Sequence, residues 1–254
     1  MTPEVPGGKR GTMTLEITDG VPLTLLPYLR ESADRLLEDA AGLPEAELRA
    51  PSRLPGWSRA HLVAHVTAGA ESRFRLLVAA RTGLPIPRYP GERDRAEQIE
   101  RDARGPAGDL LERLRTSFAK VLTAIRDHPR AAWGRPVRWS DESGRPVHET
   151  VSSLLQELEI HHVDLGTAYT PGDWPDWFAA DECRRVVADL AARSDMPGMR
   201  IATTDGEIGY DFGPGPLVTG ESRALLAWLI GRSDGAGLTV APAGPLPTPP
   251  PWRR

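Results

Sequence analysis

The residues best suited to chemistry are glutamate and histidine side chains placed four positions apart. In the segment QELEIHHVDL, residues 156–165, Glu157 and His161 have this spacing, so in a helix they share one face and can bind one ion. A second pair with the same spacing, His61 and His65, occurs earlier in the chain. Two imidazoles and one carboxylate are ligands that zinc accepts, and three protein ligands leave one coordination position open for catalysis.

Helical geometry favours His65 over His61 as the third ligand. His65 lies within the apolar stripe of its segment, which consists of Leu62, Val66, Leu76 and Ala80, whereas His61 falls outside the edge of that stripe. Glu157 and His161 lie at one edge of the stripe of their own segment, which consists of Val151, Leu154, Leu155, Leu158 and Leu165. The sequence therefore predicts a metal site of His65, Glu157 and His161 that faces the interior of a helical bundle.

Other interpretations of the same residues remain open. Glu157 and His161 at this spacing can form a half-exposed polar contact without a metal, and His61 with His65 can serve as the chelating pair. His162 lies inside the apolar stripe, which favours a hydrogen-bonded core histidine over a ligand. Asp164 can orient the imidazole of His161, or it can be a solvated acid near the helix end.

Four amphipathic helices are expected to position these residues. They cover about 21–42, 59–81, 94–127 and 148–167, with a break in the third near Gly105-Pro106. Ser58 is a suitable N-cap for the second, and 43–55 and 129–146 read as irregular connections. Four helices with one apolar stripe each predict an antiparallel bundle over residues 21–172.

Beyond residue 172 the sequence changes from long helical periods to short helix and strand signals. It predicts a small α/β domain over 173–254 that ends in a proline-rich tail. Its expected helices are 176–194 and 221–232, and its expected strands are 200–204, 207–212 and 238–241. Residues 1–20 are expected to be disordered. The predicted fold class is therefore α+β.

Composition excludes several classes of protein. The 31 basic and 35 acidic residues are nearly balanced, so no nucleic-acid footprint is evident, and no apolar run of membrane-spanning length or secretory signal is present. Cys183 is the single cysteine, which excludes an internal disulfide and favours a buried structural thiol and a cytoplasmic location. Only Lys9 and Lys120 of the basic residues are lysine, which indicates a GC-rich, actinobacterial type of coding sequence.

Three segments carry a family likeness. LPGWSRAHLVAHV (54–66) resembles a motif of the mycothiol-dependent maleylpyruvate isomerases and related DinB-like bundles, in which the second of two histidines binds metal. ELEIHHVDLGTAYTPGDWP (157–175) is similar to the second signature of that family, whose glutamate and first histidine are ligands. VTGESRALLAWLIGR (218–232) resembles the C-terminal domain of the family, where the arginine of the closing Gly-Arg is implicated in activity. Arg95, in RAEQIE, matches a recurrent family arginine.

The resemblance implies a DinB-like four-helix bundle with a small C-terminal α/β domain. It implies zinc, or another divalent metal, on His65, Glu157 and His161, with mycothiol as the thiol cofactor. It also implies that Arg232 acts in catalysis and that Arg95 and Arg232 bind cofactor or substrate. The implied reaction is thiol addition to an unsaturated dicarboxylate, followed by cis-trans isomerisation. The alternatives are a mycothiol S-transferase acting on a small-molecule electrophile, and a non-enzymatic metal- or ligand-binding module.

Overall fold

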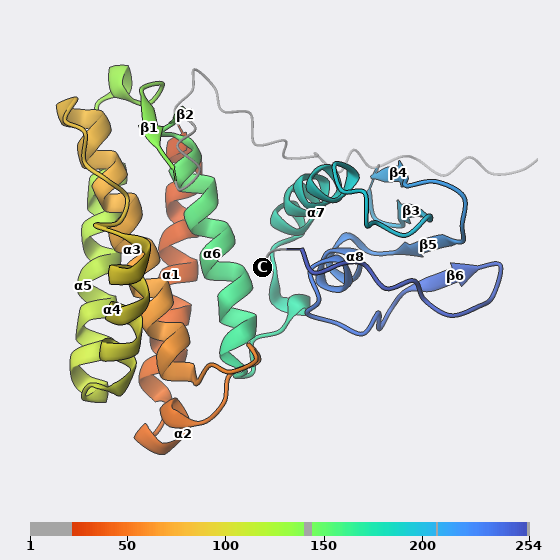
Figure 1. Ribbon diagram of the computed structural model, residues 1–254, viewed down its shortest axis with the longest axis horizontal. Helices are drawn as coiled ribbons and strands as arrows, with labels where there is room; N and C mark the ends of the chain where they lie inside the picture. Colours follow the sequence, from red (N-terminus) through yellow and green to blue (C-terminus); the bar gives the residue numbers. More distant parts are fainter. Residues whose placement is uncertain (1–21, 140–143, 207, 253–254) are drawn as a thin grey trace, which may run out of the picture. The chain divides into compact units, whose positions relative to one another are not determined.

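The chain divides into two compact units, one helical and one of mixed helix and sheet, and the division falls between Asp173 and Trp174 (Figure 1). The computed structural model describes residues 22–139, 144–206 and 208–252. The expected disorder of residues 1–20 lies outside the described residues. Within the described part, the combination of long helices with two small sheets confirms the α+β prediction.

The helical unit is built from four long helices that lie side by side and two shorter ones (Figure 1). α1 and α3 each pack against both α5 and α6, and α4 packs against α3. Three 3-10 turns, η2, η3 and η4, accompany them. The bounds are η2 (Pro22–Leu25), α1 (Leu26–Gly42), α2 (Glu45–Arg49), α3 (Arg59–Thr82), α4 (Glu92–Arg104), α5 (Ala107–Arg126), η3 (Arg130–Ala132), α6 (Glu149–Leu165) and η4 (Pro171–Asp173).

Capping residues define the ends of α3, the helix that carries His65. The Ser58 side chain accepts a hydrogen bond from the backbone N–H of His61, 3.3 Å away, and so satisfies one of the free donors of the first turn. Gly83 ends the helix in the left-handed region at φ 74°, which glycine adopts without steric cost. None of the described helices has the length and apolar character that a membrane span requires.

The core of the helical unit is formed by apolar side chains from α1, α3, α5 and α6. Each helix contributes residues spaced three or four apart, which is why the apolar periodicity of the sequence located these helices. Fully buried members include Leu29, Leu36, Leu62, Leu76, Leu114, Val121, Val151, Leu154 and Leu158.

Two connections that the sequence predicts to be irregular contain regular structure. The expected loop 43–55 includes the single-turn helix α2, and the expected loop 129–146 includes a hairpin of β1 (Pro136–Arg138) and β2 (Gly144–Pro146). These elements have three to five residues, which is too short to show a hydrophobic period. The expected break in the third helix is present, because α4 ends at Arg104 and α5 begins at Ala107.

The second unit packs helices against a four-stranded sheet of order β4-β3-β5-β6. β3 and β5 are parallel, and the other neighbours are antiparallel. α7 packs against α8. The bounds are α7 (Asp176–Ala191), β3 (Arg200–Thr203), β4 (Gly209–Asp211), β5 (Leu217–Gly220), α8 (Ser222–Leu229) and β6 (Thr239–Ala241).

The sequence prediction was wrong in three places in this unit, one of them the expected helix 176–194, whose counterpart α7 ends at Ala191. It missed β5, which lies between β3 and β6 in the sheet and whose four residues directly follow the turn-forming Pro214-Gly215-Pro216. It also extended the second helix to Arg232, whereas α8 ends at Leu229. Gly231, at φ 73°, reverses the chain there, and the backbone N–H of Arg232 closes the helix end on the carbonyl of Ala227 at 2.7 Å.

Candidate metal centre

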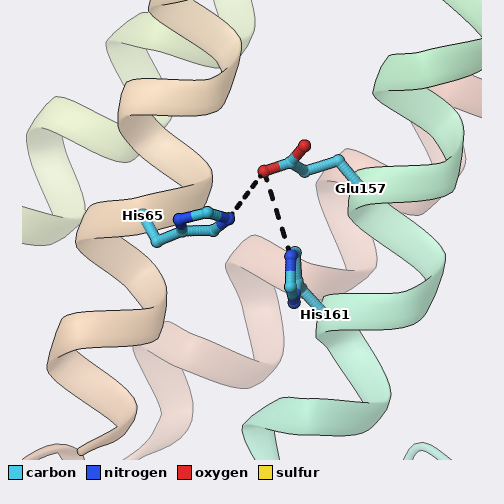
Figure 2. Close-up of side chains that lie close together, drawn as sticks. All are labelled: His65, Glu157 and His161. Atoms are coloured by element: carbon cyan, nitrogen blue, oxygen red, sulfur yellow. Dashed lines mark ion pairs between the residues drawn. The ribbon is translucent and has the colours of Figure 1, made fainter. Parts of the chain in front are cut away.

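The structure brings the three predicted ligands together between α3 and α6 (Figure 2). His65 comes from α3, and Glu157 and His161 come from successive turns of α6. Oε1 of Glu157 lies 2.9 Å from Nε2 of His65 and 3.9 Å from Nε2 of His161. One ligand atom from each residue lies within 4.8 Å of the other two. Two imidazoles and a carboxylate thus converge on one point.

The carboxylate of Glu157 is held in place by a buried arginine, Arg73 of α3. Nη2 of Arg73 donates to Oε2 of Glu157 at 2.6 Å and to Oγ of Ser153 at 2.8 Å. Burial alone would raise the pKa of Glu157, but Arg73, together with both histidines, holds that pKa well below its usual range. The carboxylate therefore stays charged, with Oε1 turned toward the histidines.

Gly69 provides the space that the Glu157 carboxylate occupies. A Cβ atom at this position would lie 2.9 Å from Oε1 of Glu157 and 3.2 Å from Nη1 of Arg73. Sequence reasoning missed both Gly69 and Arg73. A signal for them exists, because His65, Gly69 and Arg73 follow one another at intervals of four residues and so form one row along α3.

The imidazole of His161 is oriented by Asp164, one turn further along α6. Nδ1 of His161 lies 2.9 Å from Oδ2 of Asp164, whose side chain is buried. With Nδ1 directed at this carboxylate, Nε2 is the ring nitrogen that faces Glu157. A histidine that binds metal typically has such an acceptor behind it. Of the two interpretations of Asp164, the structure supports the orienting one.

The imidazole of His65 has a different neighbour on its far side. Nδ1 of His65 lies 3.1 Å from Nη2 of Arg95, and a guanidinium can only donate, so Nδ1 accepts here. The ring of Trp57 lies 5.2 Å from the His65 ring. Burial lowers the pKa of His65 against the opposing effect of Glu157, which favours the neutral form that metals require. The three donors therefore fit a divalent metal, provided that Arg95 turns away from Nδ1.

The other two histidines of these segments have separate partners. Nδ1 of His61 lies 2.6 Å from Oγ of Ser58, and its Nε2 lies 3.4 Å from a carboxylate oxygen of Glu100. Nε2 of His162 lies 2.9 Å from Oδ2 of Asp39, and its ring stacks on Tyr169 at 3.9 Å. His162 is buried, as expected for a core histidine.

Two further candidate residues lie in the α/β unit and not in the unit that holds the metal ligands. Cys183 of α7 is fully buried, and burial raises the pKa of its thiol to about 12, so the thiol remains protonated at neutral pH. Arg232 follows α8, and its Nη1 donates to the backbone carbonyl of Ile230 at 2.7 Å.

The sequence match to a known domain decides the family. A sequence profile of the mycothiol maleylpyruvate isomerase N-terminal domain matches residues 29–166, which is more than half of the chain and includes all three ligands. The chain belongs to this family. Two solved structures are similar to this family member over both units: the mycothiol-dependent maleylpyruvate isomerase and a variant of it in which one histidine is replaced by alanine.

Those two structures extend the likeness beyond the N-terminal domain. Each has a TM-score of 0.84 and 26% sequence identity, and the match covers 91% of this chain and 96% of the other. The search of curated proteins gave no match. Membership of the isomerase family is therefore established by sequence, and the fold of both units is shared with a solved isomerase.

Proposed function

We propose that this member of the isomerase family is a metal-dependent enzyme that uses mycothiol to isomerise a cis-enedioyl acid such as maleylpyruvate. The observation that carries the proposal is the convergence of His65, Glu157 and His161 within the segment that matches the family profile. Zinc is the metal best suited to two imidazoles and one carboxylate with an open position. A reducing cytoplasm is the natural location for an enzyme that depends on a free thiol.

The proposed reaction balances without an oxidant or reductant. The sulfur of the thiol adds to the activated alkene, which forms a C–S bond and turns the double bond into a single bond. Rotation about that single bond and elimination of the thiol then break the C–S bond and restore the alkene in the trans form. The thiol is regenerated, so it acts as a cofactor.

The proposal assigns separate roles to the metal and to the side chains of the protein. A divalent metal on His65, Glu157 and His161 would lower the pKa of the thiol well below its free value of roughly 8.5. Arg73 keeps Glu157 charged and positioned for that purpose. Arg95 and Arg232 bind the carboxylates of the substrate or the enolate that forms on addition, because guanidinium forks match such oxygen pairs. Cys183 takes no part, since its thiol is buried and protonated.

The test combines metal analysis with product analysis. Purified protein is incubated with maleylpyruvate, with and without mycothiol, and the products are identified by NMR and mass spectrometry. We expect the trans isomer only when mycothiol is present, and about one zinc ion per chain. His65→Ala should lose both metal and activity, whereas His61→Ala, which alters a histidine of the same helix outside the cluster, should retain both.

Other outcomes would overturn the proposal. A stable adduct of mycothiol with no release of isomer would indicate an S-transferase. Absence of both turnover and adduct, with metal bound, would indicate a binding module. Full metal occupancy in His65→Ala would contradict the ligand set itself.

A further inference from the structure

Two arginines beside the metal centre lack an acidic partner. The guanidinium carbons of Arg88 and Arg95 lie 5.2 Å and 4.9 Å from the centroid of the Tyr89 ring. Arg95 also reaches His65, and Nε of Arg88 lies 3.4 Å from Oγ of Ser72. Within the described residues, neither guanidinium forms an ion pair with a carboxylate. This positive cluster therefore touches the proposed active site directly.

Hydrogen-bond donors in the same place are also left without acceptors. The hydroxyl oxygen of Tyr89 and Nε of Arg95 are both buried, and neither has a hydrogen-bond partner among the described residues. Buried polar groups are almost always paired, because an unpaired one costs about 1–3 kcal/mol. Two such donors on adjoining side chains are available to an acceptor supplied by a ligand.

The charges near His65 do not balance. Arg73, Arg88 and Arg95 bring three positive charges, and among the described residues the carboxylate that forms an ion pair with one of them is Glu157, which is bound to Arg73. Burial, reinforced by Arg73 and Arg95, lowers the pKa of Arg88, as expected for a cation without a counterion. A divalent metal would add two more positive charges. Within the part of the chain that the structure describes, this region therefore lacks a balancing anion.

Metal binding would make Arg95 available to such an anion. A metal ion on Nε2 of His65 leaves the imidazole proton on Nδ1, and that N–H would then point at the donors of Arg95. Two donors repel each other, so the guanidinium must turn to another acceptor. Metal and anion should therefore strengthen each other's binding.

From these observations we propose that Arg88, Arg95 and the Tyr89 hydroxyl bind one carboxylate of a dicarboxylate substrate beside the metal centre. A planar carboxylate suits two guanidinium forks and a phenolic donor better than a point-like anion does. Arg88 is then a specificity-determining residue. The identity of the ligand as the enzyme's own substrate rests on the proposed function.

Direct binding of maleate to protein that has been loaded with zinc by dialysis tests this site without relying on turnover. Isothermal titration calorimetry compares wild type with Arg88→Gln, Arg95→Gln and Tyr89→Phe, and uses neutral maleamide as the uncharged analogue. Arg93→Gln is the matched control, because Arg93 lies on the same helix as Arg95 but is 90% exposed and pairs with Glu97. We expect the affinity for maleate to fall at least about tenfold in Arg88→Gln and in Arg95→Gln, because each loses a guanidinium fork. The affinity should fall less in Tyr89→Phe and should be unchanged in Arg93→Gln.

The outcomes separate this inference from the proposed function. Unchanged maleate affinity in folded, zinc-loaded Arg88→Gln overturns the site, even if maleylpyruvate is isomerised. Arginine-dependent maleate binding without isomerisation overturns the proposed reaction and leaves the site standing. If Arg88→Gln fails to fold, Arg88→Lys replaces it. Lysine keeps the positive charge but lacks the guanidinium fork, so Arg88→Lys should also have a lower affinity for maleate. An affinity equal to that of wild type would contradict the inference.

Discussion

Two adjacent histidines of α6 illustrate how a hydrogen-bond partner decides the role of a side chain. His161 is bound by Asp164 at Nδ1, which leaves Nε2 free to face Glu157. His162 is bound by Asp39 at Nε2, and its ring is covered by Tyr169. One residue of helix rotates a side chain by about 100°, so the two rings face different surroundings. Only the ring of His161 turns a nitrogen toward Glu157, with Nε2 3.9 Å from Oε1 of that carboxylate.

This difference predicts unequal effects of removing the two aspartates. Asp164→Ala removes the acceptor that fixes the His161 ring, so zinc affinity should fall by about 10–100-fold. Asp39→Ala is the matched control, because it removes the same kind of acceptor from His162 and should leave zinc affinity unchanged. Competition with a chromogenic chelator measures both. Equal zinc affinity in wild type and Asp164→Ala would show that the aspartate is not part of the metal centre.

At the residue scale, the sequence predicted which side chains cluster better than it predicted their surroundings. His65, Glu157 and His161 were found because helical spacing and the apolar stripes fix which way they point. Arg73 was not found, because arginine is usually exposed, so its position in the row with His65 and Gly69 was not interpreted as a buried one. Tyr89 lies in a connection between helices, where side-chain directions follow no period. The cluster around His65 therefore required the structure.

Among the elements, α3 determines the shape of the metal centre through one row of residues. His65, Gly69 and Arg73 follow at intervals of four, so they lie one above another on the same face of the helix. They supply in turn a predicted metal ligand, a position without a side chain, and the arginine that binds Glu157. The Glu157 side chain of α6 enters the gap at Gly69. The missing side chain at Gly69 therefore leaves the room that the Glu157 carboxylate occupies.

Filling that gap should damage the site. A Gly→Ala change inside a helix normally raises the free energy of unfolding by roughly 0.5–1 kcal/mol. Gly69→Ala, however, brings a methyl group to 2.9 Å from Oε1 of Glu157. We expect lower stability and at least about tenfold weaker zinc binding, because the carboxylate must move to avoid the overlap. Gly108→Ala is the control, since its added Cβ meets nothing within 4 Å. A Gly69→Ala protein with wild-type zinc affinity would contradict this account.

The elements themselves were predictable partly in proportion to their length. The long helices were located because several turns of apolar period and clear caps such as Ser58 and Gly83 support each other. α2, the β1–β2 hairpin and β5 have three to five residues and lie next to proline or glycine. Such short windows give only weak periodicity beside the flanking proline and glycine residues. The equally short β3, β4 and β6 were nevertheless expected from the sequence at these positions, so length alone does not decide the outcome.

At the scale of the whole molecule, all three predicted metal ligands belong to the unit that ends at Asp173. A ligand that binds only the folded state stabilises it by RT ln(1 + [L]/Kd), about 2.7 kcal/mol at a hundredfold excess over Kd. Removing zinc with a chelator should therefore increase hydrogen exchange within residues 22–173 and leave 174–252 nearly unchanged. Hydrogen-exchange mass spectrometry measures this by peptide. A uniform increase over both units would contradict a metal centre confined to the helical unit.

Arg232 lies in the other unit, and its role can be tested by a conservative change. Its Nη1 donates to the carbonyl of Ile230, so one function is to cap the end of α8. If capping is its only function, Arg232→Lys should be nearly silent. If the guanidinium also binds a substrate carboxylate as proposed, lysine is a poor substitute, and kcat/KM should fall at least about tenfold, or roughly 1.4 kcal/mol. Zinc content and Tm should be unchanged, and a silent variant would exclude the substrate-binding role.

The indole of Trp57, 5.2 Å from the His65 ring, gives the metal centre a built-in optical reporter. Cobalt(II) is a coloured, paramagnetic substitute for zinc, and it quenches the fluorescence of an indole at such short range. Loading the protein with cobalt should lower the intensity of its tryptophan fluorescence. Zinc should displace the cobalt and restore that intensity. Trp57→Phe should remove most of this response, even though six other tryptophans remain of the seven in the chain. Occupancy of the site can thus be followed in real time without any added dye.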